Sequence, residues 1–384
     1  MNSVHFQPGL DPRAQEIATE LIENILQSCA PKALMDDATI ALPPHPTHIL
    51  AFGKASIGMA RWCVNTLGDR FAGGVVLAPE SLIESINSKL SVYPADHPNP
   101  TQRNTDATNK LRAYAQAIPN DHACMVCISG GGSAHLCSPK PGVTLAKIIE
   151  TTQSLNASGA TIQTLNAARI QLETLKGGGL AAVLAHTAGN LVLVLSDVIG
   201  DDLNTIASGT MMNDKHPYPH TIIGNHASAA NAARVFLGEE TIVHTNITGD
   251  AQQQGQSLAE RFIESKSPIL FAGETTVDTA GATGTGGPCM QAALACAHQL
   301  TTSSEKDWIV LGLATDGIDG PTDACGAVIT PSMIDPSVAR TALQNHDTLP
   351  YLDRIGATIR TGPTGTNIND LVLVMTLEEK EPTP

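Results

Sequence analysis

Short apolar runs alternate with amphipathic segments along most of the chain. The runs have the length of buried strands, and the amphipathic segments repeat their apolar residues at helical spacing. Continuous apolar strands separated by helices are typical of a parallel sheet covered on both faces. We therefore expect an α/β fold, with strands at 47–52, 74–78, 124–128 and 191–195 and helices at 14–29, 57–66, 110–117, 144–155 and 176–185.

A change of pattern near residues 210–222 indicates a domain boundary. This stretch is rich in Met, Asn, Asp, Lys, His, Pro and Tyr, and it separates two sets of strands. A chain of 384 residues is also too long for one core at typical domain sizes. We expect an N-terminal domain at 1–220 and a C-terminal domain at 221–384, the second with strands at 221–224, 241–244, 268–272, 308–313 and 371–375.

The composition narrows the class of protein. With 42% hydrophobic and 15% charged residues, the chain is typical of a soluble globular protein. A formal net charge of -15 and an aromatic share of 3% argue against a nucleic-acid partner. No apolar run reaches the roughly 20 residues of a membrane span. No signal peptide is evident in residues 1–13, so we expect a cytoplasmic protein. The eight cysteines, Cys124 and Cys127 among them, are expected to be buried and reduced.

Glycine-rich turns beside the strands carry the candidate chemistry. Three of them, at 128–133, 196–202 and 314–323, follow apolar runs, and a fourth at 361–367 precedes one. Glycine lets backbone amides approach an anion closely, and open α/β sheets bind ligands at the carboxyl ends of their strands. Carboxylates beside such turns suit a magnesium ion that bridges phosphates. The combination indicates phosphoryl chemistry.

Two of these features offer groups for an anion. Lys54 stands at a strand-to-helix turn, where its ammonium group can reach a phosphate or simply lie on the surface. The turn formed by Ser129, Gly130, Gly131, Gly132 and Ser133 offers several amides, although it could also be only a flexible turn. His135 follows it as either a loop donor or a packed imidazole.

The aspartates in these turns allow more than one role. Asp197 directly follows an apolar run. Its carboxylate could accept a hydroxyl proton, hold Mg²⁺ or cap the next turn, although Asp201–Asp202 is better placed for that cap. Asp316, Asp319 and Asp323 share one glycine-rich loop, where they could bind a metal, orient the loop, or both.

Taken together and in this order, the motifs closely resemble those of the class II glycerate kinases, the glycerate 2-kinase family. The resemblance covers nearly the whole chain. The matching segments are Gly53–Ser56, Asp96–Pro98, Ser129–Ser133, Asn166–Arg169, Leu175–Leu180, Ser196–Val198, Gly273–Thr276, Ala314–Gly326 and Thr361–Asp370.

The resemblance implies two Rossmann-like three-layer domains with mostly parallel sheets and an active site in an interdomain cleft. It implies transfer of the γ-phosphoryl group of ATP, with Mg²⁺, to the 2-hydroxyl group of D-glycerate or a related small hydroxy acid, giving 2-phosphoglycerate. A homodimer is compatible with this assignment.

The resemblance also implies roles for particular residues. Lys54 takes the position of the catalytic lysine, and Asp197 that of the acidic residue near the reacting hydroxyl group. Mg²⁺ is expected at Asp197 and Asp316. Substrate or phosphate contacts are implied at Ser129, Gly130, Gly131, Gly132, Ser133, Arg169, Glu274, Thr364, Gly365, Thr366 and Asn367.

One departure from the family pattern removes a charge. After the Gly-Gly of the second domain the family continues Arg-Asn-Gln-Glu, and that arginine belongs to the active site, whereas this chain has Pro288 there. The family also has basic residues where 282–285 stand here, and Ser208–Thr210 lacks its usual Gly-Pro-Thr. An arginine beside a transferring phosphoryl group can be worth several orders of magnitude in rate.

Two interpretations therefore stay open. The chain is either a working kinase of small hydroxy acids or a catalytically impaired homologue that binds a nucleotide or sugar acid as a sensor. Some family members are called hydroxypyruvate reductases. A dehydrogenase is disfavoured because nothing here resembles a GxGxxG turn followed by a ribose-binding acid.

Overall fold

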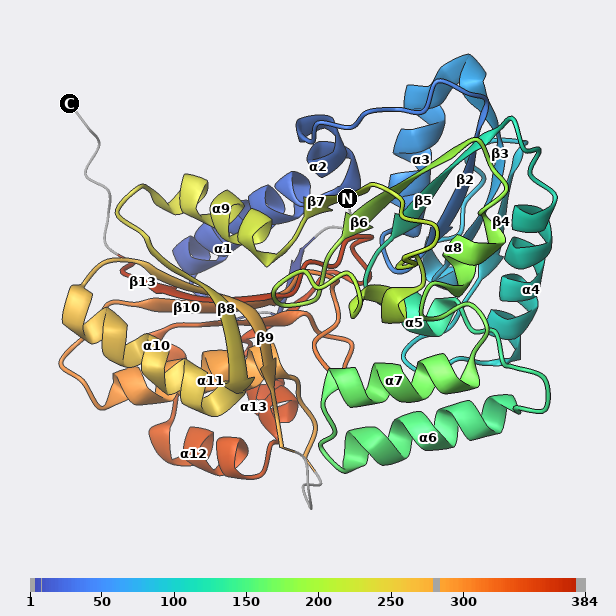
Figure 1. Cartoon of the computed structure of the whole chain (residues 1–384). Helices are drawn as coiled ribbons and strands as arrows, with labels where there is room; N and C mark the ends of the chain where they lie inside the picture. The colour runs from blue at the N-terminus through green and yellow to red at the C-terminus, as the bar shows by residue number, and fades with distance from the viewer. Residues whose placement is uncertain (1–3, 8, 279–283, 378–384) are drawn as a thin grey trace, which may run out of the picture. The chain divides into compact units, whose positions relative to one another are not determined.

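The structure is a computed structural model that describes residues 4–7, 9–278 and 284–377. It divides into two compact units (Figure 1). Unit 2 contains residues 30–225 and 365–367, and unit 1 contains the described parts of 1–29, 226–364 and 368–384. The expected division at residue 220 placed the N-terminal helix α1 (Pro12–Ser28) in the first domain. In the structure α1 belongs to unit 1, because its apolar face packs on α9 (His226–Leu237).

Unit 2 is built on a six-stranded sheet in which every pairing is parallel. β2 and β5 lie at its centre and are buried at every residue, as continuous apolar strands predict. The last strand belongs here and not to the second set, which corrects the expectation for 221–224. The order is β4 (Leu90–Pro94), β3 (Phe71–Ala78), β2 (Thr47–Phe52), β5 (Ala123–Ile128), β6 (Gly189–Leu195) and β7 (His220–Gly224).

α-Helices connect β2 to β3, β4 to β5 and β5 to β6, whereas β3 is joined to β4 and β6 to β7 by segments that contain only a 3₁₀ turn. The predicted helices at 57–66 and 144–155 correspond to α3 and α6, whereas α7 was missed. Figure 1 shows α6 and α7 as a neighbouring pair, and few of their side chains are buried. The helices are α2 (Pro31–Asp37), α3 (Ser56–Leu67), α4 (Gln102–Gln116), α5 (Gly132–His135), α6 (Leu145–Ala157), α7 (Ile162–Leu172), α8 (Gly179–Val183) and the 3₁₀ turn η3 (Ile206–Gly209).

Unit 1 has a seven-stranded sheet in which only β8 and β9 pair in parallel, unlike the mostly parallel sheet that we expected. β10 and β11 are consecutive along the chain, joined by residues 315–325 without a helix, and they pair antiparallel. The order is β1 (His5–Phe6), β12 (Thr358–Arg360), β11 (Gly326–Ile329), β10 (Ile309–Ala314), β13 (Asp370–Met375), β9 (Ile269–Thr276) and β8 (Ile242–Asp250).

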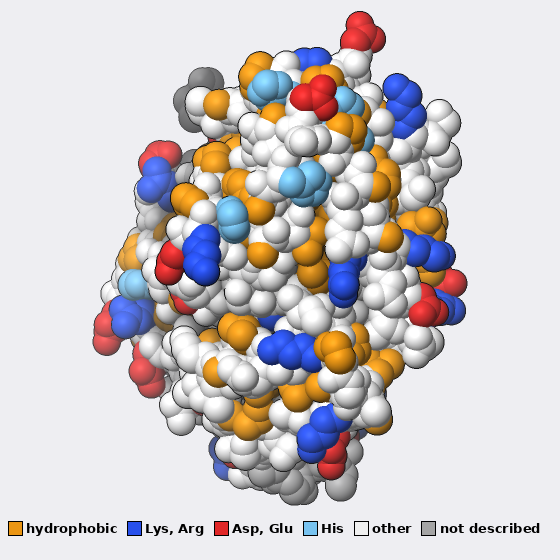
Figure 2. Space-filling view, turned by 45° about the vertical axis from the view of Figure 1, so that its right-hand side comes forward, with side chains coloured by type: hydrophobic (Ala, Val, Ile, Leu, Met, Phe, Trp, Pro, Cys, Tyr) orange, Lys and Arg blue, Asp and Glu red, His pale blue; other side chains and the backbone are white. Residues whose placement is uncertain are grey.

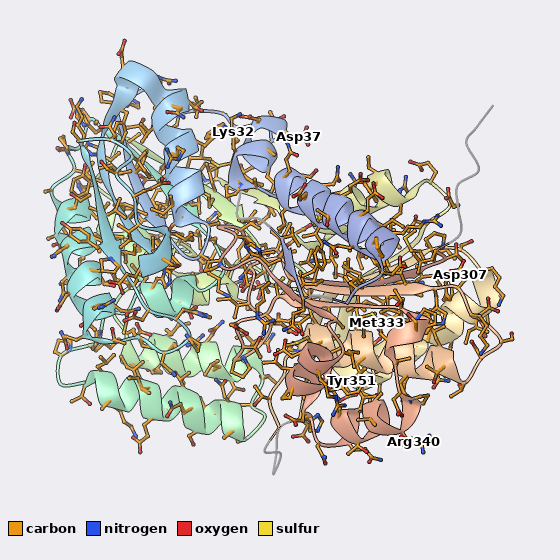
Figure 3. The ribbon with its side chains drawn as sticks, turned by 180° about the vertical axis from the view of Figure 1, so that it is seen from behind. Lys32, Asp37, Asp307, Met333, Arg340 and Tyr351 are labelled. Carbon is orange, nitrogen blue, oxygen red and sulfur yellow. The ribbon has the colours of Figure 1, made fainter. Side chains whose placement is uncertain are left out.

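The core of unit 1 surrounds α11 (Pro288–Thr301), most of whose residues are buried. Packed around it are α10 (Ala251–Ser265), α12 (Pro336–Gln344) and α13 (Thr348–Arg354). Figure 3 shows this region from behind, with Tyr351 on α13, Arg340 on α12 and Met333 just before α12. Tyr351 is part of the core and Met333 packs against it.

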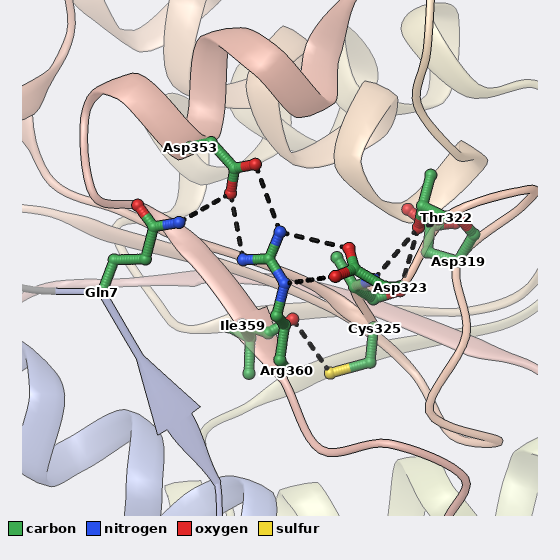
Figure 4. A network of polar contacts seen from close by, with 9 residues as sticks. Gln7, Asp319, Thr322, Asp323, Cys325, Asp353, Ile359 and Arg360 are labelled. Carbon is green, nitrogen blue, oxygen red and sulfur yellow. Dashed lines mark hydrogen bonds and ion pairs between the residues drawn. The ribbon is translucent and has the colours of Figure 1, made fainter.

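A cluster of ion pairs fixes the sheet edge of unit 1 (Figure 4). Arg360 on β12 makes two hydrogen bonds to Asp353, at 3.0 and 3.2 Å, and two to Asp323, both at 3.1 Å. Gln7 donates to the same Asp353 carboxylate at 2.9 Å. These paired bonds raise the pKa of Arg360 and lower that of Asp323. The exposed Asp323 side chain limits what its pair contributes.

The distribution of charged side chains and the state of the cysteines can be compared with what the composition predicts. Acidic and basic side chains are interspersed over the face shown in Figure 2. None of the helices in the described part of the chain is both long and apolar enough to cross a bilayer. All eight cysteines are buried and unbridged, which confirms the expectation for Cys124 and Cys127.

Candidate active site

The lysine turn and the glycine-rich turn are joined at the carboxyl end of the unit 2 sheet. β2 ends at Phe52, and Gly53 turns the chain with a φ of +112° into α3. A Cβ on Gly53 would overlap Ser129, so only glycine allows this approach. Lys54 then donates its backbone N–H to the Gly130 carbonyl at 2.8 Å, and Ala55 donates to the Ser129 hydroxyl at 3.0 Å.

His135 proves to be a buried acceptor. Its Nδ1 accepts the Gly53 N–H at 3.2 Å, so the neutral ring carries its proton on Nε2, a buried atom without a hydrogen-bond partner among the described residues. Burial lowers the pKa of His135 to about 4 and keeps the ring neutral near pH 7. The packed-imidazole alternative is therefore correct, and the imidazole supports the lysine turn.

The glycine-rich turn, residues 129–133, leaves donors open. Gly131 adopts a φ of +79°, and Gly132 donates its N–H to the Ser129 carbonyl at 3.1 Å. Within the part of the chain that the structure describes, the N–H groups of Gly130, Gly131 and Ser133 have no hydrogen-bond acceptor. Converging amides without acceptors are what an anion-binding loop requires.

Asp197 lies against this turn with a partner from far along the chain. Asn367 donates its Nδ2 to Oδ2 of Asp197 at 2.9 Å. A Cβ on Gly130 would overlap both side chains, so the glycine is needed for the approach. The capping role falls to Asp202, which accepts from the Asn204 N–H and the Thr205 hydroxyl. Sequence reasoning selected Asp197 and Asn367 separately, and the structure brings them together.

Arg169 reaches the turn through a chain of hydrogen bonds. Its Nη1 donates to Oδ1 of Asn166 at 3.3 Å, and the Ser208 hydroxyl donates to the same oxygen at 2.9 Å. Ser208 in turn contacts the Ser133 hydroxyl at 3.0 Å. Ala207 and Ser208 hold φ values of 47° and 58°, which non-glycine residues rarely adopt outside functional or constrained sites. Asn166 and Ser208 were not assigned a role from the sequence.

Positive charge gathers beside Gly131. A Cβ there would lie 3.1 Å from Cδ2 of His97 and 3.5 Å from Cγ of Lys54. His97 is exposed, yet the surrounding protein displaces enough water to lower its pKa to about 3, and the positive charges of Lys54 and Arg169 add to this effect. A proton is thus repelled where an anion would be attracted.

The candidate residues of unit 1 divide into structural and unassigned ones. Asp319 is 1% exposed and accepts the N–H groups of Cys289 and Met290 at 3.0 and 2.8 Å, so it caps the start of α11. Asp316 accepts the Ile318 N–H at 3.0 Å, which is the Asx turn considered from the sequence. With Asp323 bound to Arg360, the loop-orienting interpretation accounts for much of this cluster.

The remaining predicted contacts of unit 1 lie near these aspartates. Thr364 donates its N–H to the Asp316 carbonyl at 3.1 Å and its hydroxyl to the Thr315 carbonyl at 2.6 Å. Glu274 is exposed on β9. Burial and the charges of Asp319, Asp316 and Glu274 raise the pKa of Asp370 well above its ordinary range. Among the described residues, no three His, Cys, Asp or Glu side chains are grouped to hold a metal ion.

The proline at the family's arginine position has a structural explanation. Pro288 is the first residue of α11, after the cap residue Gly287. Proline is favoured there because its missing N–H would lack a helical partner in any case. The next two N–H groups go to Asp319, so this segment forms a well-capped helix start. Residues 282 and 283 lie outside the described residues.

The fold and the site together define an α/β protein that presents a lysine, a carboxylate and open loop amides at the carboxyl edge of a parallel sheet. Residues 16–231 match the family described as a domain of unknown function, DUF4147, and residues 267–370 match the MOFRL family. The chain belongs to the family that combines these two domains, the glycerate 2-kinase family.

Individual relatives agree with this membership. The D-glycerate 2-kinase of Thermotoga maritima is 28% identical, over 94% of this chain and 99% of its own length. An Agrobacterium vitis protein with a provisional hydroxypyruvate reductase name is 32% identical, over 85% of this chain and 98% of its own. A crystal structure of Thermotoga maritima glycerate kinase matches with a TM-score of 0.81 and 26% identity, covering 94% of this chain and 99% of that one. The predicted α/β class and family are thereby confirmed.

Proposed function

We propose that this protein transfers the γ-phosphoryl group of ATP to the 2-hydroxyl group of D-glycerate, or of a related small hydroxy acid, and releases 2-phosphoglycerate. One observation carries the proposal. Lys54, Asp197 and the open amides of residues 129–133 meet at one edge of the unit 2 sheet, in a chain whose relatives include named glycerate kinases.

The geometry supports catalysis by positioning and charge. Phosphoryl transfer needs little covalent chemistry from a protein, and most of the rate comes from orientation and electrostatic stabilisation. The amides of Gly130, Gly131 and Ser133 would bind the oxygens of the transferring group, and the Lys54 ammonium group would balance their charge. Because these amides are already ordered, little reorganisation is needed when charge develops.

Asp197 would accept the proton of the attacking hydroxyl group or hold the metal ion. Asn367 donates to Oδ2 and so fixes the orientation of the carboxylate. The positive charges of Lys54 and Arg169 favour an acceptor that is itself an anion, such as a hydroxy acid. The proposed contacts of Glu274, Thr364, Gly365 and Thr366 stay predictions, as do a homodimer and a cytoplasmic location.

Magnesium fits this chain as a nucleotide-borne ion. Mg²⁺ keeps several waters and is usually held by one or two carboxylates together with substrate phosphates. It therefore needs no cluster of three protein ligands, in keeping with the described residues. The metal-binding roles of Asp197 in unit 2 and of Asp316 in unit 1 stay predictions, whereas both oxygens of Asp319 are already used by α11. When bound, the ion would neutralise phosphate charge.

A coupled ADP-release assay tests the proposal. D-glycerate and related hydroxy acids are each offered with ATP, with and without Mg²⁺, and the product is identified by its phosphate position. Turnover that needs both Mg²⁺ and a hydroxy acid is expected. ATP or glycerate binding without any turnover would instead support the sensor alternative, which the Pro288 position motivates. Reduction of hydroxypyruvate by a nicotinamide cofactor would refute the kinase assignment.

A further inference from the structure

Lys176 is a buried cation outside the set of residues selected from the sequence. It lies between α7 and α8 and is 3% exposed. Its Nζ donates to the carbonyl of Ser133 at 2.7 Å and to that of Leu136 at 2.8 Å. Burial lowers the pKa of Lys176, and the nearby carboxylate of Glu173, itself 3% exposed, opposes this effect. Lysine is almost never buried so completely without such partners.

The two carbonyls belong to the segment that follows the glycine-rich turn. The single helical turn α5 is too short to be stable by itself. Its other late carbonyls are also bound by side chains from elsewhere. Asn104 donates to the Ala134 carbonyl at 2.8 Å, and Thr108 to the His135 carbonyl at 3.3 Å. The carbonyls of all four residues from Ser133 to Leu136 are therefore held from outside the segment.

The open amides lie directly before this segment and at its first residue. Gly130, Gly131 and Ser133 have N–H groups without acceptors among the described residues. A run of three glycines has many accessible conformations, so holding these donors in one arrangement requires contacts elsewhere. Lys176 supplies two such contacts, one of them to Ser133 itself. Preorganised donors stabilise a transition state without reorganisation during the reaction.

We propose that Lys176 is a positioning residue of the site, whose buried ammonium group holds the Gly130–Ser133 amides in their anion-binding arrangement. The proposal rests on the proposed function, since it takes the turn to bind the transferring phosphoryl group. Lys176 itself touches neither substrate nor reacting atoms in this scheme. It acts through the carbonyls of Ser133 and Leu136.

A matched control is available in the same unit. Lys140, which is half-buried, donates its Nζ to the Ile170 carbonyl at 2.9 Å, a lysine–carbonyl bond to α7 instead of to the 133–136 segment. Lys176→Met and Lys140→Met therefore remove the same chemistry from two places. Because Lys176→Met removes one of the two cations, Lys176 and Arg169, that face the buried Glu173, and can thereby destabilise the fold, the double variant Lys176→Met/Glu173→Gln is made as well. Circular dichroism and thermal unfolding select the folded variants for study.

Two measurements separate positioning from general stability. Steady-state kinetics with the hydroxy acid that the parent uses should show kcat lower by about tenfold or more in a folded Lys176 variant, with KM changed by less than about threefold, because misplaced donors act chiefly in the transition state. Hydrogen exchange followed by mass spectrometry should show faster exchange in a peptide covering 129–136, while peptides of β2 and β5 match the parent. Lys140→Met should resemble the parent in both.

The outcomes are distinct. A folded Lys176 variant with kcat within about twofold of the parent, or with unchanged exchange at 129–136, overturns the proposal. Equal losses in both lysine variants also overturn it, because they would show an unspecific effect of losing any lysine–carbonyl bond. Failure of the proposed function is seen separately, because the parent would then show no turnover with any hydroxy acid. The hydrogen-exchange comparison would still measure how strongly Lys176 orders residues 129–136.

Discussion

The buried carboxyl group of Asp319 leads to a prediction about stability and pH. It accepts two backbone N–H groups at the start of α11, which favours the charged form, but it is 1% exposed and lies near Asp316. Burial is the largest of these effects, and it raises the pKa of Asp319 to about 7. In the unfolded chain the pKa of an aspartate is about 3.9.

The sign and the size of the effect follow from linkage. Between about pH 4 and about pH 7 the folded protein binds more protons than the unfolded chain, so the free energy of unfolding falls as pH rises. The stabilisation is fully present below the unfolded pKa and is lost as pH rises through about 7. A difference of about three pKa units corresponds to about 4 kcal/mol.

Asp319→Asn removes this titration. An asparagine resembles the protonated carboxyl group in shape and in having one acceptor oxygen. We expect the free energies of unfolding of parent and variant to agree within about 1 kcal/mol only below about pH 4, where the carboxyl group is protonated in both the folded and the unfolded state. Near pH 5 the variant should already be the more stable of the two by about 1.5 kcal/mol, and near pH 8.5 by about 4 kcal/mol. The gain should grow by about 1.4 kcal/mol per pH unit up to the folded pKa of about 7 and level off above it.

Chemical unfolding across this pH range provides the assay. Trp308 is 1% exposed in the core of unit 1, so its fluorescence reports on the unit that contains Asp319. All proteins carry Trp62→Phe to silence the other tryptophan. Asp323→Asn serves as the control from the same loop, because Arg360 lowers the pKa of that exposed carboxyl group and its titration lies below this range. Parallel curves for parent and Asp319→Asn would refute the reasoning.

Three further predictions concern turnover. Lys54→Ala should lower kcat at least a hundredfold or so without unfolding the protein, and a folded variant within about twofold of the parent would remove Lys54 from catalysis. Asp197→Asn should reduce kcat by about 10²–10⁴ while ATP affinity, measured by calorimetry, changes little. Equal losses would indicate nucleotide positioning. Pro288→Arg should raise kcat/KM for D-glycerate about tenfold or more, and no gain in a folded variant would count against a weakened glycerate kinase.

The candidate site residues could be identified from the sequence because the ends of buried strands can be recognised there. An apolar run followed by glycine and a polar residue marks the edge of a sheet, and Lys54, Asp197 and the 129–133 turn were found in this way. Their meeting at one edge then follows from parallel pairing of β2, β5 and β6. No distance along the chain needs to be known for this step.

Partners from distant segments could not be predicted by the same reasoning. Asn367 reaches Asp197 from 170 positions away, and nothing in the local pattern specifies that approach. The strand at 221–224 has the same apolar pattern whichever sheet it joins, and only its pairing with β6 decides. The antiparallel arrangement in unit 1 could not be read from the connections either, because β10–β11 and β3–β4 are both joined by eleven residues without an α-helix, yet the first pair is antiparallel and the second parallel.

The backbone donors of the glycine-rich turn are easier to recognise from the sequence than the buried polar side chains that hold this turn in place. A glycine-rich turn displays its function in its composition, whereas Lys176, Asn104 and Thr108 look like ordinary surface residues of helical or loop segments. Their role depends on burial against the carbonyls of α5 and Leu136, which only tertiary structure creates.

The role of the Pro288 segment likewise depends on tertiary structure. In the sequence, this segment is recognised only by proline at the position where the family has arginine. In the structure, it is the capped start of α11, and two of its N–H groups donate to Asp319. Because that cap is complete without an arginine, loss of the charge and integrity of the fold are separate questions, and only the rate measured after Pro288→Arg addresses the first.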